Sequence, residues 1–178
     1  MRVIGGEFRS RRLKSIPGLA TRPTPDRLRE TLFDVLAPRI EGAVFLDAYA
    51  GTGAVGIEAL SRGASRAIFL ERSRAAAAVL RDNLRALGVE SRARVEQAPA
   101  ASALPRSHAD IVFLDPPYEH EREYRAAMEA LGDHPAPLVV VQHSVRFRPE
   151  ECYGALRRTR TLRQGDNALS FYEPATMP

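Results

Sequence analysis

Apolar and polar positions follow one another in short blocks, and from residue 43 onward these blocks predict alternating strands and helices. Apolar residues recur at helical spacing in three segments, at 55–60, 73–87 and 122–131. Short apolar runs between and around these helices predict five strands, at 43–47, 66–71, 92–98, 109–115 and 137–143. Buried apolar strands separated by helices are typical of a parallel α/β sheet that is covered on both faces.

The two ends of the chain show other patterns. Thr24 and Pro25 predict the start of a helix, as its N-cap and first residue, and Pro38 predicts its end. Residues 156–162 and 168–173 flank the turn-forming segment 163–167, so we expect an antiparallel hairpin to complete the sheet. Residues 1–23 are polar, basic and rich in Gly and Pro, and we divide the chain into this N-terminal arm and a domain at 24–178.

Composition narrows the class of protein. The 178 residues suit one domain, and a hydrophobic fraction of 44% suits a packed core. No stretch approaches the ~20 apolar residues of a membrane helix, and the first residues lack the apolar core of a signal peptide. Cys152 is the only cysteine, so no intramolecular disulfide can form. We therefore expect a cytoplasmic protein that contacts no membrane and is a monomer.

The charge is unevenly distributed. The net charge of the whole chain is +4, but residues 1–30 alone carry eight basic and three acidic side chains. Lys14 is the only lysine, so the basic groups are almost all arginines, which bind phosphates with two parallel hydrogen bonds. The basic surface is thus concentrated at the front of the chain, where nucleic acid is the expected partner.

A glycine-rich turn follows the first predicted strand and opens the next helix. Gly51, Gly53 and Gly56 match the dinucleotide-binding pattern, and Glu71 lies 20 residues after Gly51, where an acid binds the ribose. An oxidoreductase that uses NAD or a flavin is therefore one interpretation. Asp47 favours another, because a carboxylate beside the turn would repel a pyrophosphate but would suit an ammonium group. S-adenosylmethionine (SAM) carries an ammonium group and a ribose and has no phosphate.

The tetrapeptide Asp115-Pro116-Pro117-Tyr118 ends the clearest strand. The two prolines stiffen the backbone and remove two N–H donors, which leaves the Asp115 carboxylate and the Pro116 carbonyl as a rigid row of acceptors. A base stacked on Tyr118 would place its exocyclic amine between these acceptors, with its lone pair free to attack a methyl group. We assign catalysis to these four residues. The amine of either guanine or adenine fits this row.

Several motifs together resemble the RsmD family of SAM-dependent methyltransferases. They are the segments 47–53 and 115–118 described above, the front segments 1–13 and 22–33, and the segments 56–64 and 113–118. The resemblance covers nearly the whole chain. This family methylates N2 of a guanine, at position 966, in bacterial 16S rRNA, and acts on the small ribosomal subunit or an assembly intermediate.

The resemblance implies a Rossmann-like α/β fold, with a seven-stranded, mostly parallel sheet whose last strand is antiparallel and with helices on both faces. It also implies roles for individual residues. Where the family usually has an acidic residue at the adenine position, this chain has Gln97, and where a Glu is common after the fifth strand it has Gln142. SAM would be held by Asp47, Tyr49, Gly51, Thr52, Gly53, Glu71, Arg72, Gln97 and Ala98. Substrate RNA would be held by Arg9, Arg11, Arg12, Lys14, Arg22, Thr24 and Arg27.

Two alternatives stay open at this point. An adenine-N6 methyltransferase of DNA or RNA would use the same acceptor row, and an NAD-dependent oxidoreductase would use Gly51–Gly56. The four histidines lie far apart in the sequence without the spacing of metal ligands, so we expect no metal site.

Overall fold

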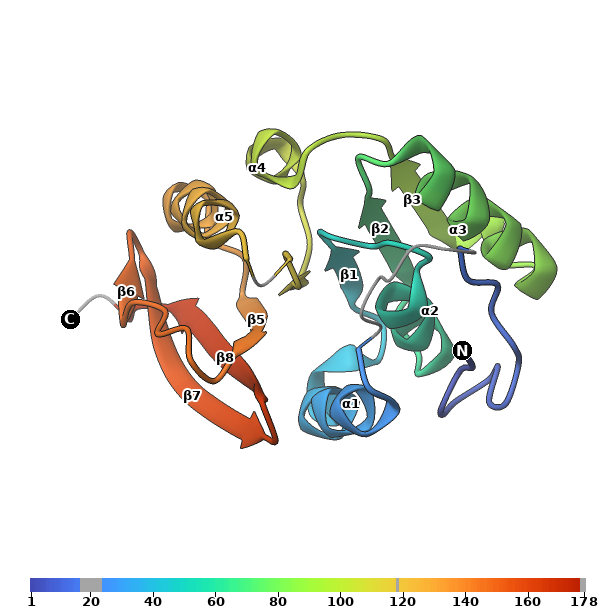
Figure 1. Cartoon of the computed structure of the whole chain (residues 1–178), viewed down its shortest axis with the longest axis horizontal. Helices are drawn as coiled ribbons and strands as arrows, with labels where there is room; N and C mark the ends of the chain where they lie inside the picture. The colour runs from blue at the N-terminus through green and yellow to red at the C-terminus, as the bar shows by residue number, and fades with distance from the viewer. Residues whose placement is uncertain (17–23, 118, 177–178) are drawn as a thin grey trace.

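The structure is a computed structural model that describes residues 1–16, 24–117 and 119–176. Strands and helices alternate along the chain as the apolar pattern predicts (Figure 1). The elements are α1 (Asp26–Ile40), β1 (Val44–Asp47), α2 (Ala54–Ser61), β2 (Arg66–Leu70), α3 (Arg74–Leu87), β3 (Ala93–Glu96), α4 (Ala100–Ala103), β4 (Ile111–Leu114), α5 (Glu121–Asp133), β5 (Leu138–Ser144), β6 (Cys152–Tyr153), β7 (Leu156–Gln164) and β8 (Asn167–Pro174).

One sheet holds every strand in the order β3-β2-β1-β4-β5-β8-β7-β6. The pairs among β1 to β5 are parallel, whereas β8 is antiparallel to both β5 and β7. The predicted α/β class and the antiparallel end of the sheet are confirmed. The predicted number of strands was one too few, because Cys152 and Tyr153 pair with β7 and form an eighth strand among the described residues. A strand of two residues is too short to show an alternating pattern in the sequence.

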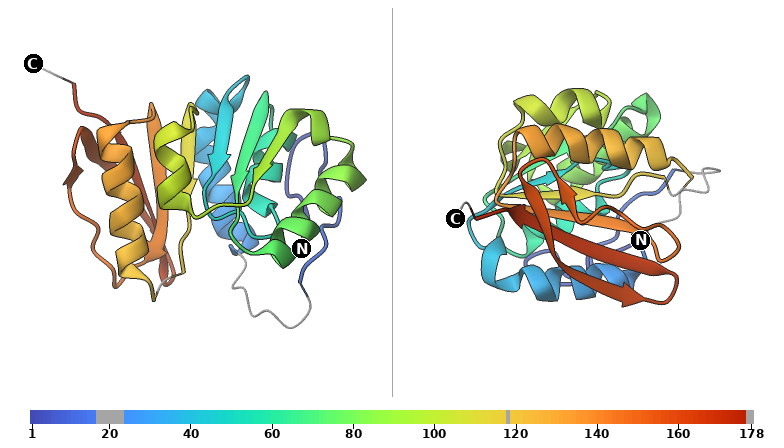
Figure 2. Two further views of the ribbon diagram at one scale, coloured as in Figure 1. Left: turned by 90° about the horizontal axis from the view of Figure 1, so that it is seen from above. Right: turned by 90° about the vertical axis from the view of Figure 1, so that its left-hand side faces the viewer.

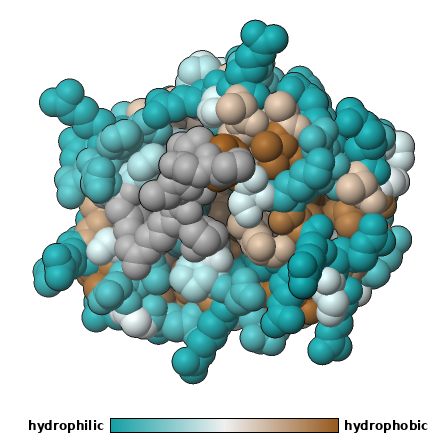
Figure 3. All heavy atoms as spheres, turned by 45° about the vertical axis from the view of Figure 1, so that its right-hand side comes forward, coloured by the Kyte–Doolittle hydropathy of each residue, from teal (hydrophilic) through white to brown (hydrophobic). Residues whose placement is uncertain are grey.

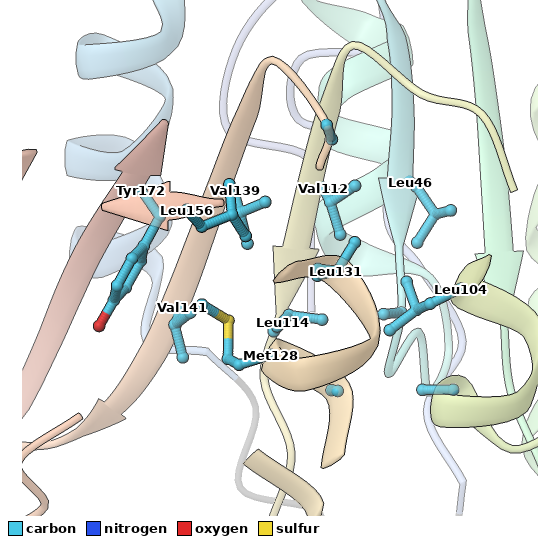
Figure 4. Packing of buried hydrophobic residues seen from close by; sticks show 14 of the residues in the cluster. Leu46, Leu104, Val112, Leu114, Met128, Leu131, Val139, Val141, Leu156 and Tyr172 are labelled. Carbon is cyan, nitrogen blue, oxygen red and sulfur yellow. The ribbon is translucent and has the colours of Figure 1, made fainter. Parts of the chain in front are cut away.

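Helices cover both faces of the sheet (Figure 2). On one face α4 and α5 close a cluster that includes Leu104, Met128 and strand residues such as Val112 and Val141 (Figure 4). On the other face α1 packs over β1, β4, β5 and β8, while α2 and α3 cover β2. No helix in the described part of the chain has the length and apolar character needed to cross a membrane.

Helix boundaries agree with the prediction at α3 and differ at α1. Ser73 caps α3 by accepting a hydrogen bond from the Ala76 N–H, and Gly88 ends the helix in the left-handed conformation. The prediction that Pro38 ends the first helix was wrong, because α1 continues to the buried Ile40. A proline so near the end of a helix removes only one hydrogen bond of the ladder. Pro25, rather than Thr24, stands at the N-cap position.

The first residues of the chain are folded onto the body. Val3, Phe8 and Leu13 are buried in the same apolar cluster as residues of α2, α3 and β2. The segment runs along these helices in Figure 2, beside α3. Arg2 and Arg12 form an antiparallel bridge, so the segment doubles back on itself. Residues 1–13 thus share the core of the body, while residues 17–23 of the predicted arm lie outside the described residues.

A buried carboxylate holds this N-terminal segment in place. Glu58 of α2 is fully buried and accepts hydrogen bonds of 2.8 Å from the N–H groups of Ile4 and Gly5. The same carboxylate accepts a hydrogen bond from Arg62 and lies 3.8 Å from the guanidinium of Arg29, which is fully buried too. Burial lowers the pKa of Arg29. Such a buried ion pair is weak evidence for stability in itself, but losing one partner is costly.

We expect Glu58→Gln to lower the free energy of unfolding by about 3–5 kcal/mol. The amide keeps one acceptor oxygen for two backbone N–H groups, and it leaves Asp26, whose side chain is half-exposed, as the carboxylate that pairs with the Arg29 guanidinium. Urea denaturation measures the change, with the exposed Glu30→Gln on α1 as the matched control. Equal unfolding free energies for the two variants would contradict the role given to Glu58.

Candidate active site

A hollow opens where the strand order reverses, at the carboxyl ends of β1 and β4. These strands run parallel, with Asp47 paired to Phe113, so both predicted motifs reach the same edge of the sheet. Such a switch point is the usual ligand site of an open α/β sheet. The hollow has a volume of about 760 Å³ and is lined by residues that follow β1, β2, β3 and β4, and by Thr24 and Pro25 before α1. On the face in Figure 3, apolar side chains gather within a rim of hydrophilic ones.

The glycine turn is built as the sequence predicts. Gly51 and Gly53 both have positive φ angles, of 55° and 90°. A Cβ on Gly53 would lie 2.2 Å from Leu80 and one on Gly56 would lie 2.3 Å from Phe69, so α2 packs closely on α3 and β2 at these points. A Cβ on Gly51 would meet nothing within 4 Å. Gly51 and Thr52 line the hollow, whereas Gly53 and Gly56 shape the turn behind it.

Asp47 is a buried carboxylate in the wall of this hollow. Its side chain accepts a hydrogen bond of 3.0 Å from the Gly56 N–H, across the turn. Burial raises the pKa of Asp47 to about 7, and the nearby Glu71 carboxylate adds to this rise. A carboxylate in this position gains most from a positively charged ligand group, which would offset the cost of its burial.

Glu71 directly follows β2 and reaches the same glycine turn. One of its oxygens accepts a hydrogen bond of 2.8 Å from the Gly51 N–H and the other a bond of 2.7 Å from the Ser73 N–H. These bonds fix the carboxylate at the hollow while a lone pair on each oxygen stays available for a hydroxyl group.

Of the other residues predicted to bind SAM, three line the hollow and one lies at the surface. Tyr49, Arg72 and Ala98 line the hollow, and Arg72 forms a salt bridge of 3.3 Å with Glu123. Burial raises the pKa of Tyr49 above its usual value, so its hydroxyl stays neutral. Gln97 is exposed and is not part of the lining, although its neighbours Ala98 and Pro99 are.

The acceptor row lies across the hollow from the glycine turn. Asp115 is half-buried, and its carboxylate accepts a hydrogen bond of 3.4 Å from the Thr24 hydroxyl. Pro116 and Pro117 line the hollow with it. Tyr118, the predicted stacking platform, lies outside the described residues.

Three polar residues of the site were not assigned a role from the sequence. The buried Tyr124 hydroxyl donates to the carbonyls of Pro116 and Gln142, at 3.1 and 3.0 Å, and so ties the ends of β4 and β5 together. Gln142 and Asn167 line the hollow from β5 and β8. Their spacing in the sequence gives no sign of this proximity, because only the pairing of β5 with β8 creates it. Among the described residues no cluster of side chains could hold a metal ion.

The cations predicted to bind RNA lie at different distances from the hollow. Arg27 is exposed in the first turn of α1, three residues after Thr24. Arg9 lies two residues after Glu7, whose N–H donates to the carbonyl of Ser61, the last residue of α2, whereas the hollow borders the first residues of that helix. The rise of 1.5 Å per residue therefore puts the Arg9 turn roughly 10 Å along the helix axis from the hollow. Arg11 donates to the Ala86 carbonyl.

Lys14 and Arg22 also belong to this predicted set, and the structure describes only Lys14 of the two. Lys14 forms a salt bridge of 3.2 Å with Asp82, with both side chains exposed. Arg22 lies outside the described residues.

Comparison with known proteins identifies a family and relatives that match most of the chain. The model of a family described as "Conserved hypothetical protein 95" matches residues 1–173. The Bacillus subtilis protein named "Putative rRNA methyltransferase YlbH" is 34% identical over 97% of this chain and 98% of its own length. "Ribosomal RNA small subunit methyltransferase D" of Escherichia coli is 46% identical over 66% of this chain, and the alignment spans 60% of that protein.

Solved structures share the fold. "Putative methyltransferase yhhF" from Escherichia coli has a TM-score of 0.85 and 34% identity, with 99% of each chain covered. A more distant likeness is the Thermus thermophilus 16S rRNA N2 G1207 methyltransferase RsmC, solved with AdoMet and guanosine. It has a TM-score of 0.72 and 21% identity, covers 90% of this chain and 46% of that one, and supports the fold alone.

We expect Asp47→Asn to remove a pH-dependent part of the stability. Because the pKa of Asp47 is raised from 3.8 to about 7 by folding, the stability linked to its proton is fully present below pH 3.8 and is lost as the pH rises through about 7. The amide carries no charge, so the variant should gain stability over the wild type as the pH rises, on the order of a few kcal/mol by pH 8.

Urea denaturation between pH 5 and pH 8.5 measures this difference, with the exposed Asp133→Asn as control. A constant gap between Asp47→Asn and the wild type over that range would show that the carboxyl group is not protonated by burial.

Proposed function

The chain belongs to the family described as Conserved hypothetical protein 95, the RsmD family of rRNA methyltransferases, and we propose that it transfers a methyl group from SAM to N2 of a guanine in 16S rRNA. The observation that carries the proposal is the hollow at the β1–β4 switch, with a buried carboxylate on one side and a proline-stiffened row of acceptors on the other. Relatives named as rRNA methyltransferases support the same reaction class.

The glycine-turn side fits SAM. The Asp47 carboxylate would pair with the ammonium group, which would restore its ionised form, and Glu71 would accept the ribose hydroxyls. The turn at Gly51 leaves open space for the ligand, since a Cβ there would meet no atom within 4 Å. Tyr49, Thr52, Arg72 and Ala98 would complete the binding wall, whereas the exposed Gln97 does not line the hollow. SAM supplies an electrophilic methyl group when it is bound.

The acceptor row would act on the target amine. The Asp115 carboxylate and the Pro116 carbonyl would accept the two N–H hydrogens of guanine N2, which draws the nitrogen toward tetrahedral geometry and frees its lone pair. Thr24 and Tyr124 would hold these two acceptors in place through the hydrogen bonds described above. Formation of the new N–C bond would accompany cleavage of the bond between the methyl carbon and the sulfonium sulfur, with S-adenosylhomocysteine as the leaving group, and the Asp115 carboxylate would receive the proton that the amine loses. Pro117 and Tyr118 would stiffen the row and stack on the base.

The substrate would be 16S rRNA in the small ribosomal subunit or an assembly intermediate, with guanine 966 as the target. The E. coli relative is named for the small subunit, and RsmC, which shares the fold, was solved with guanosine. The adenine-N6 alternative would use the same acceptor row. The oxidoreductase alternative has no support among the named relatives, and the buried Asp47 would repel its pyrophosphate.

Product analysis tests the proposed reaction. Small subunits from a strain that lacks this gene are incubated with the protein and methyl-tritiated SAM, and their rRNA is digested to nucleosides. We expect label in N2-methylguanosine at one site. Label in N6-methyladenosine would favour the alternative, and calorimetric binding of NAD but not of SAM would overturn the proposal.

We expect Asp115→Asn to slow methyl transfer by about 10²–10³-fold, the usual cost of removing one charge-stabilising group from an active site. The affinity for SAM should stay within about twofold of the wild type, because Asp115 faces the target base. Single-turnover rates and calorimetry measure the two effects, with the exposed Asp34→Asn on α1 as control. Undiminished turnover would remove Asp115 from the reaction.

The N-terminal cations should contribute to RNA affinity by neutralising phosphates. Replacing Arg9, Arg12 and Arg27 with Ala should weaken binding of small subunits and reduce the slope of log affinity against log salt by about one for each phosphate that is no longer neutralised. Arg11 is kept, because it also binds the Ala86 carbonyl. Filter binding at several salt concentrations measures the slope, and a slope equal to that of the wild type would show that these arginines do not bind phosphates.

A further inference from the structure

The pairing of β4, β5 and β8 brings three polar side chains into one row. The last parallel pairs of β4 with β5 are Phe113–Val140 and Leu114–Val141, so the next step places Asp115 beside Gln142. On the other side of β5, Gln142 pairs with Leu169 of β8 and Ser144 pairs with Asn167. Neighbouring strands lie about 4.8 Å apart, so Gln142 lies directly beside Asp115, whereas Asn167 stands on the next strand and two residues farther along the edge of the sheet.

All three side chains leave the same face of the sheet. Residues two apart on a strand share a face, so Asp115 goes with Phe113, Gln142 with Val140, and Asn167 with Leu169. Phe113, Val140 and Leu169 belong to one apolar cluster under α1. The row therefore lies at the open end of that cluster, and Asp115, Gln142 and Asn167 all line the hollow.

Gln142 and Asn167 are buried although they are polar. Their exposed fractions are 3% and 7%. Both line a hollow large enough for a base. The backbone under the row is held firmly as well, because the Tyr124 hydroxyl bonds the carbonyls of Pro116 and Gln142 from the other face of the sheet.

The row presents acceptors at one end and amide donors next to them. Asp115 can only accept while it is ionised, whereas Gln142 and Asn167 each carry an NH₂ group. The Watson–Crick edge of guanine has the complementary order, with donors at N2 and N1 followed by an acceptor at O6. This edge is about as wide as the ~4.8 Å spacing between neighbouring strands. Adenine presented through N6 has no carbonyl oxygen at the corresponding place.

We propose that Gln142 and Asn167 determine the base specificity of this enzyme by donating hydrogen bonds to O6 of the target guanine, while Asp115 accepts from N2. The inference rests on the proposed function and adds the residues that select guanine over other purines that carry an amine. Gln142 is the principal donor, because it stands directly beside Asp115, whereas Asn167 lies on the next strand opposite Ser144.

The test pairs a variant with a changed base. Small subunits are reconstituted with 16S rRNA that carries either guanine or 2-aminopurine at the target, since 2-aminopurine keeps the N2 amine but lacks O6. We expect Gln142→Leu to lower kcat/KM on guanine by about 10- to 100-fold, the usual value of a specific polar contact to a base edge. On 2-aminopurine the variant should stay within about twofold of the wild type, so its preference for guanine should collapse.

Three further proteins complete the design. Asn167→Asp keeps the shape of the side chain but loses its donor, and should reduce the preference for guanine in the same direction. Gln164→Leu is the matched control, because Gln164 lies in the β7–β8 hairpin, bonds to Thr31 and does not line the hollow. This variant should leave kcat/KM unchanged on both substrates. The wild type serves as reference on both substrates, and calorimetry with SAM confirms that each variant is folded.

The outcomes distinguish a failure of the specificity role of the two amides from a failure of the proposed methyl transfer. Equal losses on guanine and 2-aminopurine for Gln142→Leu, together with an unchanged preference in Asn167→Asp, would show that the two amides are structural and would overturn the inference. A wild-type enzyme that transfers no methyl group to the guanine substrate would overturn the proposed function itself, and the inference with it.

Discussion

Parallel pairing of β1 with β4 is the constraint on which the site depends. These strands are far apart in the chain, yet their register brings Asp47 opposite Phe113, two residues before Asp115. Because parallel strands end at the same edge of a sheet, the glycine turn after β1 and the proline-stiffened row after β4 must face one hollow. The two motifs would carry no joint chemistry if either strand ran the other way.

Two buried carboxylates, one near each end of α2, fix the position of this helix beside the site. Asp47 accepts a hydrogen bond from Gly56 near the start of the helix, and Glu58 holds the first residues of the chain near its end. These carboxylates are both almost completely buried, and each is expensive unless its partners are present. Helix α2 is therefore held tightly against β2, where a Cβ on Gly56 would collide with Phe69. The cost of burying Asp47 also gives the site a preference for a positively charged ligand.

Local patterns in the sequence predict most of the framework. Apolar runs mark β1 to β5, and the glycine turn, the Ser73 cap and the hairpin before β8 follow from residue types at short range. The stop at Pro38 fails because tertiary burial of Ile40 outweighs a local signal. The folded N-terminal segment is invisible at short range, since it depends on Glu58 more than 50 residues away. Gln142 and Asn167 meet Asp115 only through the register of three strands, which composition and spacing do not encode.

The central claim is that one hollow brings the methyl group of SAM up to the acceptor row. A crystal structure of the protein soaked with SAM tests it most directly. The account predicts the ammonium group against Asp47, the ribose against Glu71, and the methyl group turned toward the space between the Asp115 carboxylate and the Pro116 carbonyl. A methyl group that faces away from Asp115, or SAM bound elsewhere on the protein, would contradict the account.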